Sequence, residues 1–421
     1  IQLCGLISGW GCAMTSAWQI GPCKLFLVKT LALAFLFSAL LLIADHSVQA
    51  QTETVLYNFA GSPDGANPES ALTPDGTGNF YGTTSLGGLG YGTVYELSPN
   101  GSGGWIETVV YSFTKGSYGV SAYPSGVIFD SLGNLYGTTT YGGANGYGAA
   151  FELSEVGGVW TEIVLHNFAG GASDGAYPYG GVIMDSKGNL YGGTIQGGNA
   201  GDGTFYELSP SGGDWTEAVI YNYDFNGLTM DAAGNILGVA LDDGKPSIIE
   251  QSPNGDGGWN QSVIHSFSPQ FGLSNPVFDQ AGNIYCAIAG GKRGTGHGSV
   301  YKFTRGKKGK WTGKAIPLEG GADGSDPGGI VVDSSGNIYG IMTFGGTGEG
   351  TAGAGTVYEL VAPVGTGLYQ EKLLWTFNGA DGTEPLGTLV LDSSGNLYGT
   401  TEYGGEFGAP YGDGVVFEVT P

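Results

Sequence analysis

The stretch DSLGNLYGTT at residues 130–139 decides the fold, because it is one copy of a unit that the chain repeats seven times. Each copy reads D-x-x-G-N, followed by an aliphatic or aromatic residue and then usually by Tyr-Gly. Successive copies begin 46 to 59 residues apart, and regular self-similarity near 50 residues is typical of propellers and solenoids. The copies begin at Asp75, Asp130, Asp185, Asp231, Asp279, Asp333 and Asp392.

The second copy predicts four short strands, at residues 125–130, 135–140, 149–153 and 160–168. Asp and Asn tolerate turn conformations and Gly supplies positive φ, so we interpret D-x-x-G-N as the turn between the first two strands. Four antiparallel strands per unit form a propeller blade. A parallel β-helix would need shorter repeats, and a helical solenoid would need helices. The sequence therefore predicts an all-β, seven-bladed β-propeller.

The first and fourth strands of each unit carry their own pattern. Bulky side chains would collide where seven innermost strands meet at a channel, and one position of the first strand is always small or compact. Trp or Tyr stands near the start of most fourth strands, where packing between blades is favoured over a platform for carbohydrate. The small residues are Ala71, Gly126, Gly181, Gly227, Asn275, Gly329 and Thr388.

The two ends of the repeat are out of phase. Residues 53–59 match a fourth strand, although no first strand precedes them, and residues 414–419 match a third strand. We therefore expect the N-terminal strand to complete the last blade, which closes the ring and removes two exposed edges. The predicted blades are 68–113, 124–168, 178–223, 226–267, 275–319, 327–377, and 385–419 with 53–59.

Composition excludes one class of partner. The chain has 83 Gly and 18 Pro residues, and its net charge is -24. Binding to nucleic acid needs clustered Lys and Arg, so we expect no nucleic-acid partner. The acidity serves solubility or, in the sharper alternative, provides a surface that binds cations.

Residues 1–50 are predicted to be a leader that precedes the propeller at 51–421. Lys24 and Lys29 flank an apolar core at 30–44, and a small-x-small motif ends at Ala50, as in a secretory signal peptide. Cleavage there would leave no membrane segment, whereas an uncleaved membrane anchor is the alternative.

We expect the mature chain to be a monomer that is secreted, periplasmic or on the cell surface. The mature chain would keep only Cys286, which we expect to be buried.

A family resemblance rests on the run NFYGTT at 79–84, Gly87-Gly88, and GTVYEL at 92–97. These motifs resemble the GloVer tandem-repeat family of bacterial proteins, with good copies at 134–153, 189–208, 337–360 and 396–419. The copies at 235–250 and 283–303 depart from the pattern, the second through Cys286 and Lys302. The resemblance implies exported, surface-associated propellers and implies no particular activity.

The connections from fourth to first strands and from second to third strands share one face, the loop-rich face. Four Asp-Gly pairs lie on it, at Asp64, Asp174, Asp323 and Asp381. They are either turns on a mobile rim or a ring of carboxylates that binds calcium or a sugar. We expect no other cofactor.

Loop lengths predict a notch in this face. The connections of blade four are short and contain Asp242 and Asp243, whereas blades six and seven have long loops across the ring. A ligand would enter the notch, with Asp323 and Asp381 on the high wall. His297 is a further candidate for ligand binding, because the repeat does not fix its position.

No catalytic constellation is visible in the sequence. A nucleophile elbow, a metal-spaced His pair and a Ser/His/Asp set at positions that break the repeat are all missing. The repeat's uniformity favours a non-enzymatic binding module whose loop-rich face takes a protein or a glycan. The alternative is a propeller hydrolase or lyase that acts on a sugar or a lactone at the channel mouth.

Overall fold

The computed structural model describes most of the chain after the leader. Its described residues form strands and turns and no helix, so none of their segments is a helix that could cross a membrane. Residues Gln51–Pro421 form one compact unit, and the predicted leader lies outside the described residues. The described residues are 51–114, 124–268, 272–290, 298–307, 309–319, 324–346, 353–408 and 412–421.

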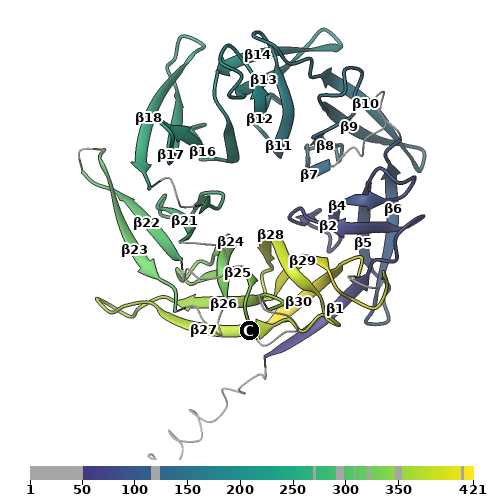
Figure 1. Ribbon diagram of the computed structural model, residues 1–421, viewed down its shortest axis with the longest axis vertical. Helices are drawn as coiled ribbons and strands as arrows, with labels where there is room; N and C mark the ends of the chain where they lie inside the picture. The colour runs from purple at the N-terminus through teal and green to yellow at the C-terminus, as the bar shows by residue number, and fades with distance from the viewer. Residues whose placement is uncertain are drawn as a thin grey trace, which may run out of the picture. The chain divides into compact units, whose positions relative to one another are not determined.

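Seven antiparallel sheets form a ring, which confirms the seven-bladed propeller (Figure 1). Blade one contains β2 (Gly65–Pro68), β3 (Thr73–Pro74), β4 (Phe80–Gly87), β5 (Thr93–Pro99) and β6 (Trp105–Ser112). Blade two contains β7 (Pro124–Phe129), β8 (Leu135–Thr139), β9 (Ala149–Val156) and β10 (Val159–Asn167). Blade three contains β11 (Gly175–Met184), β12 (Leu190–Gly197), β13 (Thr204–Ser211) and β14 (Asp214–Tyr221).

The remaining blades repeat this order. Blade four contains β15 (Phe225–Met230), β16 (Ile236–Asp242), β17 (Lys245–Pro253) and β18 (Trp259–Ser266). Blade five contains β19 (Gly272–Leu273), β20 (Val277–Phe278), β21 (Ile284–Ala289), β22 (Ser299–Arg305) and β23 (Trp311–Pro317). Blade six contains β24 (Ser325–Val332), β25 (Ile338–Phe344), β26 (Thr356–Val361) and β27 (Gln370–Thr376). Blade seven contains β28 (Thr383–Leu391), β29 (Leu397–Tyr403), β30 (Val415–Thr420) and β1 (Thr52–Asn58).

The N-terminal strand closes the ring as expected. β1 pairs antiparallel with β30 from Thr52 opposite Thr420 to Asn58 opposite Val415. In Figure 1 the purple β1 therefore lies beside the yellow β30. The last blade is completed by hydrogen bonds between strands from the two ends of the repeat.

The D-x-x-G-N motif forms a turn, as the sequence predicts. One oxygen of the Asp130 carboxylate accepts hydrogen bonds from the N–H groups of Leu132 and Asn134, at 2.8 and 2.9 Å. The other oxygen accepts from the Asn134 side chain at 2.9 Å. Burial alone would raise the pKa of Asp130, but these bonds outweigh burial and hold the pKa below its usual value. Both oxygens of the motif's Asp therefore accept hydrogen bonds from its own turn.

Neighbouring blades pack through apolar clusters, one at each of the seven junctions among the described residues. At the junction of blades three and four, the ring of Trp259 lies 5.5 Å from that of Tyr191, so this tryptophan packs between blades. The innermost strands approach closely. A Cβ on Gly329 of blade six would lie 2.3 Å from the Thr388 hydroxyl of blade seven. The expected need for small residues at the channel is therefore confirmed.

The first strands are less regular than the sequence suggests. In blades one and five the first strand divides into two short pieces, and in blades two, three, four, six and seven its register shifts. Small residues at the crowded channel weaken regular pairing, and bulges let the strand turn past its neighbour. Cys286 is buried, and its thiol donates to the Ser274 carbonyl at 3.1 Å, as expected for a packing residue.

Candidate functional site

A cavity of about 340 Å³ lies on the ring axis, because the innermost strands of several blades line it. Its walls come from blades one, two, three, five and seven. Hydroxyl, amide and backbone groups predominate among them, and Glu69 is the one carboxyl group among the lining residues. The polar lining consists of Glu69, Ser70, Ser125, Thr140, Asn275 and Thr388. Such a lining offers hydrogen bonds to an uncharged polar ligand.

Tyr179 is the aromatic wall of this cavity. It stands where the pairing of β11 with β12 shifts, between Tyr179 and Val182, and Gly180 and Gly181 have positive φ there. The shift turns the tyrosine out of the blade, and 58% of its surface is exposed. An exposed aromatic face beside hydroxyl groups is a surface on which a sugar ring can stack.

A second feature is a set of glutamates around Tyr403. The pKa of the Tyr403 phenol is raised first by its hydrogen bond with Glu402, then by burial, and further by the charges of Glu402, Glu384 and Glu69. Glu69 also lines the axial cavity. Glu69 of blade one therefore lies on the cavity wall and also acts on Tyr403 of blade seven.

Asp64 occupies the junction between blades seven and one rather than the axis. Its carboxylate accepts hydrogen bonds from the Tyr57 hydroxyl at 3.0 Å and from the Ala60 N–H at 2.9 Å. Glu107, on β6, lies beside it. Burial first, and then the charge and hydrogen bond of Asp64, raise the pKa of Glu107 to about 8.

Asp381 holds the corresponding place between blades six and seven. Its carboxylate is buried and accepts from the Asn378 N–H at 2.8 Å, the Asn378 side chain at 2.9 Å and the Trp375 indole at 3.2 Å. Burial, then the charge of Asp381, raise the pKa of Glu53 on β1 to about 7. The expected turn role of this Asp-Gly pair is therefore visible, whereas ligand or metal binding at Asp381 stays a prediction.

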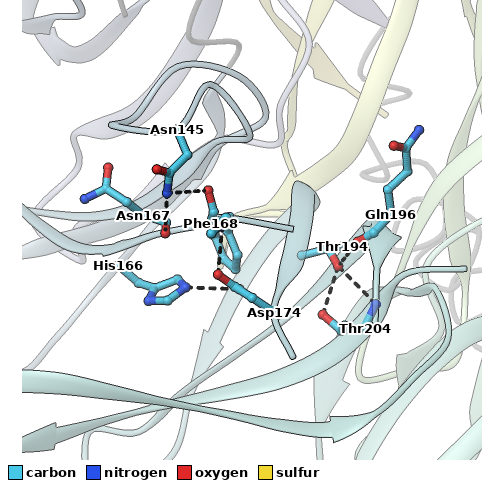
Figure 2. Close-up of polar contacts among 9 residues, drawn as sticks. Asn145, His166, Asn167, Phe168, Asp174, Thr194, Gln196 and Thr204 are labelled. Atoms are coloured by element: carbon cyan, nitrogen blue, oxygen red, sulfur yellow. Dashed lines mark hydrogen bonds and ion pairs between the residues drawn. The ribbon is translucent and has the colours of Figure 1, made fainter. Parts of the chain in front are cut away.

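Asp174 makes the third such junction, between blades two and three, and here the neighbour is a histidine (Figure 2). His166 Nε2 lies 3.2 Å from Asp174 Oδ1, and the Ala169 N–H donates to Asp174 Oδ2 at 2.7 Å. Glu217, on β14, completes the group: ligating atoms of the three residues all lie within 4.8 Å of one another. Burial, then the charge of Asp174, raise the pKa of Glu217 to about 7, against an opposing effect of His166.

The predicted ring of carboxylates thus divides into separate junctions. Among the described residues, the one group of three or more potential metal-ligating side chains is His166, Asp174 and Glu217. Asp64, Asp174 and Asp381 each have their own partners, and Asp323 and His297 lie outside the described residues. A calcium site at these aspartates stays a prediction.

Blade four has the short connections that the sequence predicts. Asp242 pairs with Lys245, so Asp243 and Gly244 alone make the turn between β16 and β17, with φ of 50° and 72°. Positive φ at both positions matches the tight turn that Asp-Gly favours in hairpins. In contrast, residues 345–355 and 404–414 connect the corresponding strands of blades six and seven. Ligand binding at Asp242 and Asp243 stays a prediction.

The glutamates at the blade junctions were not predicted from the sequence, although a sequence pattern marks them. Glu107 and Glu217 each stand two residues after the Trp that begins a fourth strand, and Glu53 holds the same place in β1. Side chains two residues apart on a strand share a face, so the Trp and the Glu both point toward the neighbouring blade. A recurring W-x-E therefore marks acids at blade junctions.

Comparisons with known proteins agree with this architecture. The sequence pattern of the Gloeobacter/Verrucomicrobia repeat matches residues 45–251, which confirms the GloVer resemblance. No match was found among curated proteins.

Solved structures with a similar fold share little sequence with the chain. A protein from Lactobacillus plantarum is 11% identical, with a TM-score of 0.52, and the match covers 74% of this chain and 85% of that one. A Bacteroides uniformis protein, provisionally described as a 6-phosphogluconolactonase, is 14% identical, with a TM-score of 0.50 and coverage of 74% and 86%. At this identity the likeness concerns the fold alone.

Proposed function

We propose that this chain, which carries the Gloeobacter/Verrucomicrobia repeat, is an exported, monomeric binding module that takes an uncharged glycan in its axial cavity. The observation that carries the proposal is Tyr179, an exposed aromatic ring set among hydroxyl and amide groups. Stacking on an aromatic face, with hydrogen bonds to sugar hydroxyls around it, is chemistry that such a lining provides. The net charge of -24 disfavours acidic polysaccharides.

The uniformity of the repeat favours binding over catalysis. The aspartates of the seven turns accept hydrogen bonds from their own turns, as Asp130 does. Asp64, Asp174 and Asp381 hold backbone N–H groups at the junctions. None of these carboxylates lines the axial cavity, whose walls carry mainly neutral groups.

A hydrolase that acts on a sugar or a lactone is the second candidate. Glu69 on the cavity wall favours it, with Glu384 and Glu402 acting on the same Tyr403, because glycoside hydrolysis needs paired carboxyl groups. Turnover of oligosaccharides or lactones, abolished in Glu69→Gln, would favour this candidate over simple binding.

Calorimetric titration with neutral cell-surface oligosaccharides tests the binding proposal. We expect Tyr179→Ala to weaken binding roughly tenfold, as loss of one stacked aromatic contact. Phe407→Ala is the matched control, because Phe407 is an exposed aromatic of the blade-seven loop and does not line the cavity. Binding that is lost in Phe407→Ala and kept in Tyr179→Ala would place the ligand on the loops and reject the cavity.

A further inference from the structure

We propose that His166, Asp174 and Glu217 bind one zinc-class divalent ion, which bridges blades two and three. The three side chains come from β10, from the connection before β11, and from β14. Their potential ligating atoms lie within 4.8 Å of one another. Imidazole nitrogens and the carboxylate oxygens of Asp and Glu are ligands that zinc takes in proteins.

The distance between His166 and Asp174 suits two ligands of one ion. Ligands about 2.0 Å from a tetrahedral zinc ion lie about 3.3 Å apart. His166 Nε2 and Asp174 Oδ1 are separated by 3.2 Å. These two atoms are therefore already placed for a shared ion, and a Glu217 carboxylate oxygen lies within 4.8 Å of both.

Surrounding contacts hold the ligands in place. The Ala169 N–H fixes Asp174 Oδ2, which leaves Oδ1 facing the histidine. The His166 ring stands edge-on to Phe168, with centroids 4.8 Å apart. Contacts of this kind orient metal ligands and strengthen binding.

The same site has an unsatisfied atom and a path from solvent. Glu217 Oε1 is buried and has no hydrogen-bond partner among the described residues. The side chains of His166 and Asp174 are 21% and 14% exposed, so an ion can reach them from water. A buried acceptor without a donor is stabilised by a cation.

The corresponding junctions at Asp64 and Asp381 lack the histidine that Asp174 has beside it. Tyr57 and Trp375 occupy the place of His166 beside Asp64 and Asp381, and both donate a hydrogen bond to the aspartate. An indole N–H cannot ligate a metal, and a phenol with a raised pKa keeps its proton. Histidine alone supplies a nitrogen lone pair here. Imidazole suits zinc rather than calcium, which requires six or more oxygen ligands.

Thermal unfolding at pH 7.5 with and without zinc tests the proposal, because an ion that binds only the folded chain raises Tm. With the chain from Gln51 to Pro421, we expect Tm to rise with zinc and to stay unchanged with calcium. Calorimetry should give one zinc ion per chain. Cobalt in place of zinc should show the visible absorption of a four-coordinate ion.

Two substitutions make the test specific. His166→Tyr introduces the residue found at Tyr57, so the fold should be kept while the zinc response disappears. Tyr57→His, beside Asp64 and Glu107, should create a second site and raise the stoichiometry from one to two. A wild type without a zinc response, or a response that survives in folded His166→Tyr, would overturn the proposal.

Discussion

At the scale of single residues, the glutamates at the blade junctions have strongly raised pKa values. Glu107 lies between two blades beside the Asp64 carboxylate, and its Oε1 is buried. Burying a charge beside a like charge disfavours ionisation. At neutral pH the folded protein therefore keeps a proton on Glu107 that the unfolded chain has already released.

This linkage sets the sign of the pH dependence. The pKa values of Glu107, Glu217 and Glu53 rise from 4.5 to about 8, 7 and 7 on folding. Stability from a raised pKa is fully present below the unfolded value and is lost as pH rises through the folded value. We expect Tm to fall steadily between about pH 5 and pH 8. A Tm that rises across this interval would contradict the linkage.

Glu107→Gln tests the residue directly, because Gln261 already stands at the corresponding place after Trp259 in blade four. The amide keeps the shape and carries no charge. We expect the variant to melt on the order of 2 °C higher than the wild type at pH 8, after allowance for solvent screening. At pH 5, where the wild-type glutamate is protonated, the two Tm values should coincide. Glu155→Gln, at an exposed site, is the control and should change neither.

At the scale of elements, a glycine and a proline join each blade to the next at five junctions. The glycine precedes the third strand of one blade, and the proline lies in the first strand of the following blade. A Cβ on the glycine would lie within about 3 Å of the proline ring at all five. The pairs are Gly92 with Pro124, Gly148 with Pro178, Gly298 with Pro327, Gly355 with Pro385, and Gly414 with Pro68.

Gly148→Ala should therefore destabilise the junction of blades two and three. Its Cβ would lie 2.4 Å from the Thr139 carbonyl oxygen and 2.6 Å from Pro178 Cδ, so backbone must move. Gly158 also has positive φ but has open space around it, which makes Gly158→Ala the matched control. We expect about 1 kcal/mol for the control, from backbone strain alone, and at least twice that for Gly148→Ala. Equal losses in urea unfolding would show that packing against Pro178 contributes nothing.

At the scale of the whole molecule, the repeat made the ring predictable. Turn residues, small residues at the channel and the phase of the two ends depend on local backbone needs that recur in every copy, so each copy supports the others. Residues 53–59 could be assigned to the last blade because no first strand precedes them. The structure agrees in the pairing of β1 with β30.

The site was harder to predict, because it depends on contacts between copies. The sequence places Asp174 in a loop, but the direction of its carboxylate is set by His166 and Ala169 of the preceding blade and by Glu217 on a later strand. Tyr179 looks like any strand residue until the register shift turns it outward. Side-chain directions at bulges and junctions follow from neighbouring blades, which a single-copy pattern does not contain.

Ring closure itself yields the last prediction. β1 and β30 are held together by hydrogen bonds and side-chain packing, with no covalent link between them, so unfolding can begin where the ring opens. In Thr52→Cys with Thr420→Cys, a disulfide would join directly opposed residues and close a loop that spans nearly the whole propeller. By chain entropy, such a crosslink stabilises the folded state by roughly 6 kcal/mol, against roughly 2 kcal/mol for a crosslink across a short hairpin.

Val156→Cys with Val159→Cys, opposed across the β9–β10 turn, is that short-loop control. Under oxidising conditions the first pair should raise Tm far more than the second, and reductant should abolish both gains. If the two crosslinks raise Tm equally, the ring does not open first between β1 and β30, and its closure adds no more stability than any single hairpin.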